Sequence, residues 1–317
     1  MKLDIPKTTN NMKIQDELPR AHMGVSLAGE ECDRKLWLIF RWVIIEKFDE
    51  RIKMIFRLGK EAEKWMVDDL RSAGVSLNNV LDDQEILDFG KHVKGSPDGV
   101  GIGFLEAPKK AHLVEFKTIN DKGFKALVSK GVKESRYMHY AQTQCYMYHK
   151  ELDRTFYLAM NKNDSSYYQE RWELDKELAE KLIKRLQRIA LQDRLPVPLS
   201  TDKEFWRCRF CPMQEFCFEG GTPEVNCRTC AHSTAREDDT WFCERWENII
   251  PVNGQREGCR SHVIHPDLVD AKIEECDDWN VYYDGILVGE KGVSSKDYLE
   301  MSAEAIANMF KGFVVRK

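Results

Sequence analysis

Two short segments hold the residues best suited to chemistry, Gly95-Ser-Pro-Asp-Gly99 and Val114-Glu-Phe-Lys117. Asp98 begins one expected strand, and Glu115 and Lys117 end the next, where residues two apart share a face. If the two strands pair, two carboxylates and one ammonium group meet in one small pocket. Such oxygen ligands suit Mg²⁺ or Mn²⁺, with water and a substrate phosphate completing the octahedron.

Phosphodiester hydrolysis is the chemistry that this pocket would support. A bound metal would polarise the phosphoryl oxygen and lower the pKa of a bound water, while Lys117 would orient that water or stabilise the developing charge. An Asp-Gly turn and a Glu-x-Lys strand edge also occur in purely structural roles. The neighbouring residues therefore matter for the interpretation.

Further polar residues flank these two segments. Glu63 lies on a predicted helix, four residues after Gly59. Downstream, two Gln/Tyr pairs are each spaced by one helical turn, so the members of a pair share a helix face. The pairs are Gln142 with Tyr146 and Gln144 with Tyr148, and the sequence does not choose between them.

With these motifs, the chain resembles the PD-(D/E)XK nucleases of the RecB/AddB exonuclease type, including the iron–sulfur branch used in CRISPR adaptation. The resemblance covers about residues 30–220 and implies a metal-dependent DNA exonuclease. RecB-type members usually have His where this chain has Glu63, and glutamate there is closer to the phage-type exonucleases. The residues that the resemblance assigns to catalysis or metal binding are Glu63, Asp98, Glu115, the carbonyl of Phe116, Lys117, Gln142 and Tyr146.

Two other functions stay open for the same core. One is a structure-specific or restriction-like endonuclease, and the other is a non-catalytic DNA-binding or assembly protein that keeps the fold. The intact set of two acids and a lysine favours an enzyme. We expect it to act in DNA recombination or repair, or in phage DNA processing, with DNA as substrate and recombination or replication proteins as candidate partners. Homo-oligomerisation is left open.

The first of two cysteine groups has the spacing C-x₂-C-x₅-C. Three thiolates so close in sequence are poor disulfide partners in a reducing compartment but good ligands for one metal centre. Cys32 is the candidate fourth ligand. The resemblance implies a [4Fe–4S] cluster on this set, and a zinc site with the same ligands is the alternative. The set consists of Cys32, Cys208, Cys211 and Cys217.

The second group has the spacing C-x₂-C-x₁₂-C-x₁₅-C, which is typical of a structural Zn²⁺ site. Three histidines nearby, His232, His262 and His265, are able to replace one cysteine. The cysteine-rich stretch is similar to those of phage-encoded nucleases. One interpretation is that this stretch forms a surface that binds DNA or a partner. The other is that its zinc only stabilises the fold and the stretch contacts neither. Its predicted zinc ligands are Cys227, Cys230, Cys243 and Cys259.

The formal net charge of −5 speaks against a nucleic-acid partner only if the charge is evenly spread. Residues 109–136 hold eight basic and three acidic residues, whereas residues 266–317 hold six basic and eleven acidic ones. The region around the proposed site is thus locally positive and suited to a phosphate backbone and stacked bases. The residues predicted to contact DNA are Lys122, Lys125, Lys130, Lys133, Arg136 and Tyr140.

The elements that must position these residues follow from hydrophobic periodicity and turn signals. Helices are expected over 32–48, 57–73, 124–129, 136–150 and 175–192, and strands over 84–89, 99–104, 112–117, 154–160 and 167–172. This order predicts an α/β (mixed α+β) fold, a mixed sheet flanked by helices and not a doubly wound parallel sheet. The predicted divisions are a lead-in (1–30), a nuclease domain (31–220), a zinc module (221–265) and an acidic tail (266–317).

Targeting signals are not apparent in the sequence. No apolar run reaches the ~18 residues of a membrane span, and the N-terminus lacks the apolar segment of a signal peptide. We therefore expect no membrane partner and a cytoplasmic location, that of the bacterial host if the protein is phage-encoded.

Overall fold

The computed structural model describes residues 18–220, 223–259 and 261–268, and the backbone of three later strands. Its centre is a five-stranded sheet in the order β2-β5-β6-β7-β8, in which β6 and β7 are parallel and the other pairs antiparallel. The predicted mixed α/β architecture is confirmed. The strands are β2 (Ser76–Asn78), β5 (Gly99–Ile102), β6 (His112–Ile119), β7 (Arg154–Asn161) and β8 (Tyr167–Glu173).

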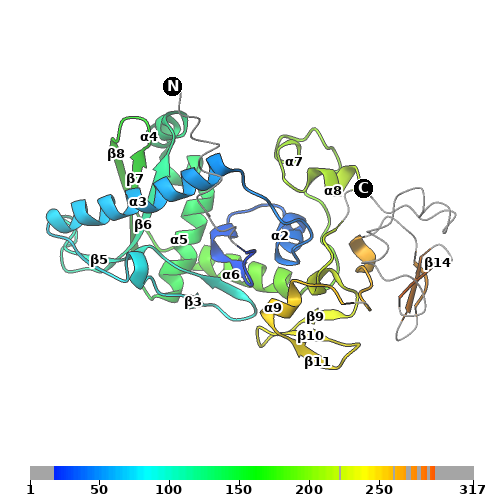
Figure 1. Cartoon of the computed structure of the whole chain (residues 1–317). Helices are drawn as coiled ribbons and strands as arrows, with labels where there is room; N and C mark the ends of the chain where they lie inside the picture. Colours follow the sequence, from blue (N-terminus) through cyan, green and yellow to red (C-terminus); the bar gives the residue numbers. More distant parts are fainter. Residues whose placement is uncertain are drawn as a thin grey trace, which may run out of the picture.

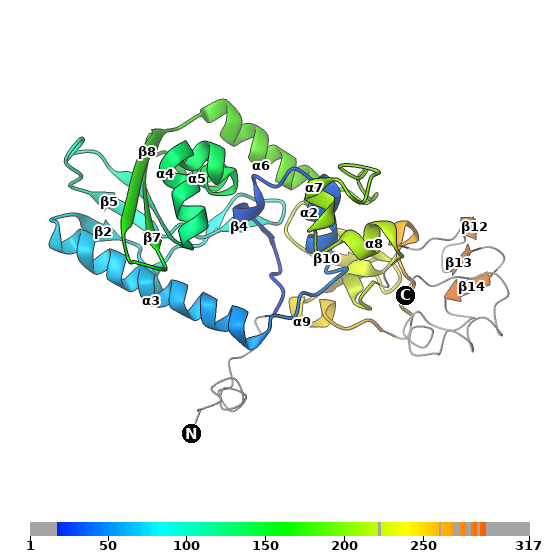
Figure 2. The same cartoon turned by 90° about the horizontal axis from the view of Figure 1, so that it is seen from above.

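Helices cover both faces of this sheet (Figures 1 and 2). On one face, Val114 and Phe116 of β6 pack with Ala62 and Met66 of α3. Alternate residues of a strand point to opposite faces, so Glu115 and Lys117 face the other helices. The helices are α2 (Asp33–Phe40), α3 (Glu50–Ser72), α4 (Asp121–Ser135), α5 (Tyr137–His149) and α6 (Lys176–Leu191).

Polar side chains set where three of these helices begin. At the start of α3, the Asp49 side chain accepts a hydrogen bond from the backbone N–H of Ile52. Asn120 and Asp175 accept equivalent bonds at the starts of α4 and α6. Each cap satisfies a backbone donor that the first helical turn leaves unpaired. The Asp49 cap starts α3 seven residues before the predicted start at Arg57.

The predicted helix 32–48 is wrong beyond its first two turns. α2 ends at Phe40, and Trp42 has a φ of 53°, which a helix does not allow. The surrounding contacts hold this conformation. The Trp42 indole N–H donates to the carbonyl of Arg20, and the guanidinium of Arg228 lies 3.8 Å from the centre of its ring.

The predicted strand 84–89 is also largely wrong. Only Leu87–Asp88 (β3) is extended, and it belongs to a separate small sheet with β4 (Val93–Gly95) and β1 (Met23–Gly24). Residues Leu81–Asp83 form a 3-10 turn before it. The small sheet packs beside α5 and α6, so the segment leaves the main sheet before returning to it through β5.

The C-terminal cysteine-rich segment shares the core of the preceding domain. Its sheet consists of β9 (Ser233–Ala235), β10 (Trp241–Cys243) and β11 (Asn248–Ile250). Trp241 is buried in the same cluster as Trp37 and Phe40 of α2. The segment is therefore anchored to the preceding part of the chain by a common hydrophobic cluster.

Among the described residues, three short helices and four 3-10 turns complete the ordered elements, and a further sheet follows. The helices are α7 (Trp206–Arg209), α8 (Gln214–Phe218) and α9 (Val252–Gln255), with 3-10 turns at Val25–Leu27, Cys227–Thr229 and Pro266–Leu268 in addition to Leu81–Asp83. The three later strands, Ile273–Cys276, Asn280–Tyr283 and Ile286–Gly289, form an antiparallel sheet. Most of the predicted acidic tail lies outside the described residues. Within the described part, no helix has the length and apolarity to cross a membrane.

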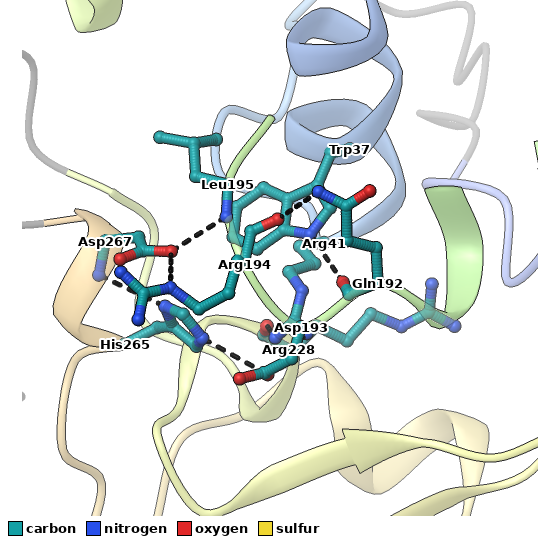
Figure 3. Close-up of polar contacts among 9 residues, drawn as sticks. All are labelled: Trp37, Arg41, Gln192, Asp193, Arg194, Leu195, Arg228, His265 and Asp267. Carbon is teal, nitrogen blue, oxygen red and sulfur yellow. Dashed lines mark hydrogen bonds and ion pairs between the residues drawn. The ribbon is translucent and has the colours of Figure 1, made fainter. Parts of the chain in front are cut away.

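A buried arginine, Arg41, joins the end of α2 to the segment that follows α6 (Figure 3). Arg41 lies 4.6 Å from the centre of the Trp37 ring, and it pairs with Asp193 at 3.2 Å. His265 contacts the same Asp193 oxygen at 3.3 Å. Because His265 Nδ1 accepts from the N–H of Asp267, its Nε2 carries the proton and donates to Asp193.

A second buried arginine, Arg228, makes the longest-range contacts of the C-terminal segment. It donates to the carbonyls of Phe40 and Ala21 at 2.8 and 2.7 Å and to Gln255 at 2.9 Å. Burial lowers the pKa of Arg228 to about 9, so it remains charged at neutral pH. Arg228 thus adds hydrogen bonds to the packing of Trp241 in joining the C-terminal segment to the N-terminal part.

We expect Arg228→Ala to lower the free energy of unfolding by about 3 kcal/mol, because it leaves two buried carbonyls and an amide without their donor. Urea denaturation followed by tryptophan fluorescence measures the change. Arg236→Ala is the matched control, since Arg236 also lies over an aromatic ring but is exposed, and we expect a loss below about 1 kcal/mol. Equal losses in the two variants would contradict this role of Arg228.

Candidate active site

Asp98, Glu115 and Lys117 meet at the junction of β5 and β6. The two strands pair with Gly99 opposite Val114, which places Asp98 beside Glu115 and Phe116 in the middle of β6. The Asp98 carboxylate accepts a hydrogen bond from the Phe116 N–H at 2.7 Å. The predicted convergence of these side chains is what the structure shows, and their chemical roles stay predictions.

The ammonium of Lys117 lies among the oxygens that the resemblance assigns to a metal. It forms an ion pair with Glu115, lies 3.5 Å from Asp98 Oδ2, and donates to the Phe116 carbonyl at 3.0 Å. These oxygens therefore already surround one positive charge. Glu115 is fully buried, and its second oxygen, Oε2, has no hydrogen-bond partner.

Electrostatics make this group of residues receptive to a further cation. Burial and the negative charge of Asp98 raise the pKa of Glu115, while the two carboxylates raise that of Lys117 against the effect of burial. Two acids share one ammonium, and one buried carboxylate oxygen is unpaired. The donor set consists of hard oxygens and fits Mg²⁺ or Mn²⁺, with Asp98, Glu115 and the Phe116 carbonyl as ligands.

Glu63 approaches the same site from α3. Its carboxylate accepts a hydrogen bond from the Gln84 side chain at 2.7 Å. Burial and the nearby charge of Asp98 raise the pKa of Glu63 to about 7. The sequence interpretation did not include Gln84, because it lies in a loop 21 residues away and only the three-dimensional fold brings it to Glu63.

The structure distinguishes the two Gln/Tyr pairs. Gln142 donates to the Tyr146 hydroxyl at 3.3 Å, and Glu115 is among the charges that raise the pKa of Tyr146, after burial itself. Gln144 instead bonds the backbone of Glu173 and Asp175. The other tyrosine of that pair, Tyr148, donates to Glu180 on α6, so the first pair faces the site and the second ties α5 to its surroundings.

Two further aromatic residues near the site were not predicted. Tyr157 pairs with Glu115 across β6 and β7, and its hydroxyl lies 2.9 Å from His139 Nδ1. Burial and the charge of Lys117 lower the pKa of His139 to about 3, so the imidazole is neutral. The alternation of β7 places Tyr157 on the site face, and that pattern is the signal that could have found it.

The predicted DNA-contacting residues form a mainly exposed group on α4 and the turn after it. Lys122, Lys125, Lys130 and Lys133 are exposed, and Arg136 is half-buried. The prediction that Tyr140 contacts DNA by stacking is wrong. Its ring is only 7% exposed because it packs against Trp172, with the Lys133 ammonium 5.2 Å from its centre.

The first cysteine set surrounds a cavity of about 260 Å³ at the start of α2. Cys32 caps this helix and accepts from the Lys35 N–H at 3.4 Å. Burial raises the pKa of the other three thiols, and Cys32 contributes to each shift. The cavity lining includes all four members: Cys32, Cys208, Cys211 and Cys217.

The second cysteine set surrounds a separate cavity of about 300 Å³. Its lining includes Cys227, Cys230, Cys243 and Cys259, as well as His232 and His262. All nine cysteines that the structure describes are free thiols. Nowhere in the described chain do three Cys, His, Asp or Glu side chains already stand as a metal-coordinating group, so binding of an ion would draw them together.

Comparison with known proteins gives a likeness of fold. No family model matches the chain, and no curated protein matches it. The fold is similar to two crystal structures of LHK-Exo, an alkaline exonuclease from Laribacter hongkongensis, one of them in complex with dAMP. Both share 15% identity, with TM-scores of 0.41 and 0.40, covering 53% and 54% of this chain and 86% and 87% of that one.

A crystal structure of SSO0001 is also similar, at 13% identity and a TM-score of 0.36, covering 67% of this chain and 94% of the other. The strand order and the flanking helices of the present chain are consistent with a PD-(D/E)XK-like core.

Gly95 sets the position of Tyr146, because a Cβ atom there would lie 2.7 Å from the tyrosine hydroxyl. We expect Gly95→Ala to lower the free energy of unfolding by about 1–3 kcal/mol through overpacking and to disturb the Gln142–Tyr146 contact. In the matched variant Gly59→Ala, the new methyl meets nothing closer than 3.8 Å, and we expect a gain of about 0.5–1 kcal/mol in α3. Thermal unfolding of both variants is the measurement, and a neutral Gly95→Ala would contradict the contact.

The raised pKa of Glu63 would give a pH dependence to metal binding at this site. A divalent cation favours the charged carboxylate and displaces its proton. The contribution of Glu63 to the Mn²⁺ affinity should therefore rise with pH up to about 7 and level off above it. Isothermal titration calorimetry at pH 6, 7 and 8 measures the slope.

We expect Glu63→Gln to bind Mn²⁺ more weakly and with a smaller pH slope than the wild type. Glu61→Gln serves as control, since Glu61 pairs with Lys64 on the same helix. Identical slopes in the wild type and Glu63→Gln would show that Glu63 does not take part.

Proposed function

We propose that the protein is a Mg²⁺- or Mn²⁺-dependent DNA exonuclease that hydrolyses phosphodiester bonds. The observation that carries this proposal is the convergence of Asp98, Glu115 and the Phe116 carbonyl on one cation, the Lys117 ammonium, beside an unpaired buried carboxylate oxygen. The fold likeness to an alkaline exonuclease agrees with it. The biological setting that we propose is DNA recombination, repair or phage DNA processing, in the cytoplasm of a bacterial host.

Each group of site residues has a separate role in this proposed reaction. A metal held by the two carboxylates and the Phe116 carbonyl would supply charge stabilisation and activation of water at the scissile phosphate. Lys117 keeps its positive charge in the site and donates hydrogen bonds to the attacking water or to the phosphate oxygens. Tyr146, held by Gln142, presents its hydroxyl beside Glu115 and orients the substrate.

The lysines of α4 would guide DNA to these residues. Asp98, Glu115 and Glu63 repel phosphate, so a basic approach surface is needed beside them. α4 begins two residues after β6 ends, which places its exposed ammonium groups next to the strand that carries the site. We propose contacts from Lys122, Lys125, Lys130, Lys133 and Arg136.

We further propose that both cysteine cavities hold metal. A [4Fe–4S] cluster on the first set would join cysteines with 175 residues between them in the chain, and so close the domain. Zn²⁺ on the second set would order the short strands around it. Each set lines one cavity, which supports these assignments. Iron, sulfide and zinc contents of the purified protein test them, and a colourless protein with zinc alone would exclude the cluster.

Digestion of end-labelled linear and covalently closed circular DNA tests the activity. We expect the wild type to degrade linear DNA in Mn²⁺ or Mg²⁺ and to leave the circle intact, with activity in Lys117→Ala lowered at least 100-fold. Lys110→Ala is the control, because Lys110 is an exposed lysine near the same strand.

The outcomes separate the competing functions. Cleavage of the circle would favour the endonuclease, and binding of DNA without cleavage in Mn²⁺ would favour a non-catalytic protein. Full activity in Lys117→Ala would exclude this site as the catalytic centre.

A further inference from the structure

The cavity of the second cysteine set contains more donors than a zinc ion needs. Zn²⁺ in structural sites binds four ligands, and the described lining offers four thiols and two imidazoles. The C-x₂-C-x₁₂-C-x₁₅-C spacing in the sequence suggested that the four thiols complete the shell. The hydrogen bonds of one histidine point to a different set.

His262 is bonded in the way of a metal-ligating histidine. It is 1% exposed, and its Nε2 lies 3.1 Å from the carbonyl oxygen of Asn226. A carbonyl oxygen only accepts, so Nε2 carries the proton and Nδ1 carries the lone pair. Nδ1 is buried and has no partner. Metal-binding histidines commonly donate their other N–H to a carbonyl, which fixes the ring for the ion.

Two turns of the same form border the cavity. In the first, the N–H of Cys230 donates to the carbonyl of Cys227, and in the second, the N–H of His262 donates to the carbonyl of Cys259. Each turn carries a zinc-type donor at its first and last position, and these four donors line the cavity. Each turn thus offers two donors to the same cavity.

Backbone pairing places the first turn beside the second. The N–H of Ala231, directly after the first turn, donates to the carbonyl of Val263, directly after the second, at 2.7 Å, and Cys230 pairs with Ile264. Cys243 belongs to neither turn, since it lies on β10 with strands paired on both sides.

We infer that the zinc site of the C-terminal segment is formed by Cys227, Cys230, Cys259 and His262 Nδ1, and that Cys243 is not a ligand. The Cys227 thiol donates to the carbonyl of Glu257 at 3.3 Å, a bond that zinc would replace. This inference rests on the proposed zinc content and specifies its ligands.

The position of the site links metal binding to the way the C-terminal segment is held against the rest of the chain. Arg228, which reaches Phe40 and Ala21, lies inside the first turn, between two of the ligands. Fixing Cys227 and Cys230 on an ion also fixes the backbone that presents Arg228. Zinc in this site would thereby hold the C-terminal segment against the end of α2.

The test is zinc content per chain, measured by inductively coupled plasma mass spectrometry on full-length protein with iron measured in parallel. We expect His262→Gln to lose one zinc per chain relative to the wild type, and Cys243→Ser and His232→Gln to retain it. Retention in His262→Gln together with loss in Cys243→Ser would overturn the inference in favour of the four-cysteine set. Loss in His232→Gln with retention in His262→Gln would overturn it as well.

A second variant keeps the test decisive if His262→Gln does not fold. His262→Cys supplies a fourth thiolate and should retain one zinc. After replacement of zinc by Co²⁺, its thiolate-to-cobalt absorption should be stronger than that of the wild type, because a nitrogen ligand has become a sulfur. An unchanged cobalt spectrum would show that residue 262 is not a ligand. A wild-type protein without zinc would instead refute the zinc proposal itself, before any variant is compared.

Discussion

Burial of the Glu115 carboxylate beside Lys117 is the constraint on which the rest of the structure depends. Removing a charge from water is costly unless an opposite charge and hydrogen bonds compensate for it. Lys117 provides that charge, and Asp98 is held in place by the Phe116 N–H. The surrounding elements serve this arrangement, since α3 covers one face of the strand and α5 brings Tyr146 to the other.

The short helix α2 connects two regions that are far apart in sequence. Its first residues follow Cys32, at the first cysteine cavity, and its end presents the Phe40 carbonyl to Arg228 from the second. Arg41 extends the link to Asp193 after α6. The eight residues of α2 thus contact both cysteine-rich parts. The order of either part therefore depends on α2, although a helix of this length is not stable alone.

The sequence was most informative where local patterns carry the signal. The strands β6 to β8 and helix α6 lie within a few residues of their predicted ranges. β6 and β7 are almost continuously buried strands, and α6 buries one face, so each has a clear local pattern. The meeting of Asp98 with Glu115 and Lys117 followed from the pairing of adjacent strands. Gln84, Gly95 and the choice of Gln142 over Gln144 could not be predicted, since each depends on contacts between segments distant in the chain.

The errors have the same physical origin. Tyr140 is an aromatic residue of the kind that stacks on bases, but the Trp172 ring across the helix–sheet interface buries it. The helix predicted to reach Phe48 ends early because Arg228, 186 residues beyond Trp42, holds that tryptophan in a left-handed conformation. The spacing of the second cysteine set identifies candidate thiol ligands. It does not show which histidine ring nitrogen lacks a hydrogen-bond partner. A buried imidazole with one nitrogen bonded to a carbonyl has its other nitrogen available for a metal, and only the hydrogen bonds show which nitrogen that is.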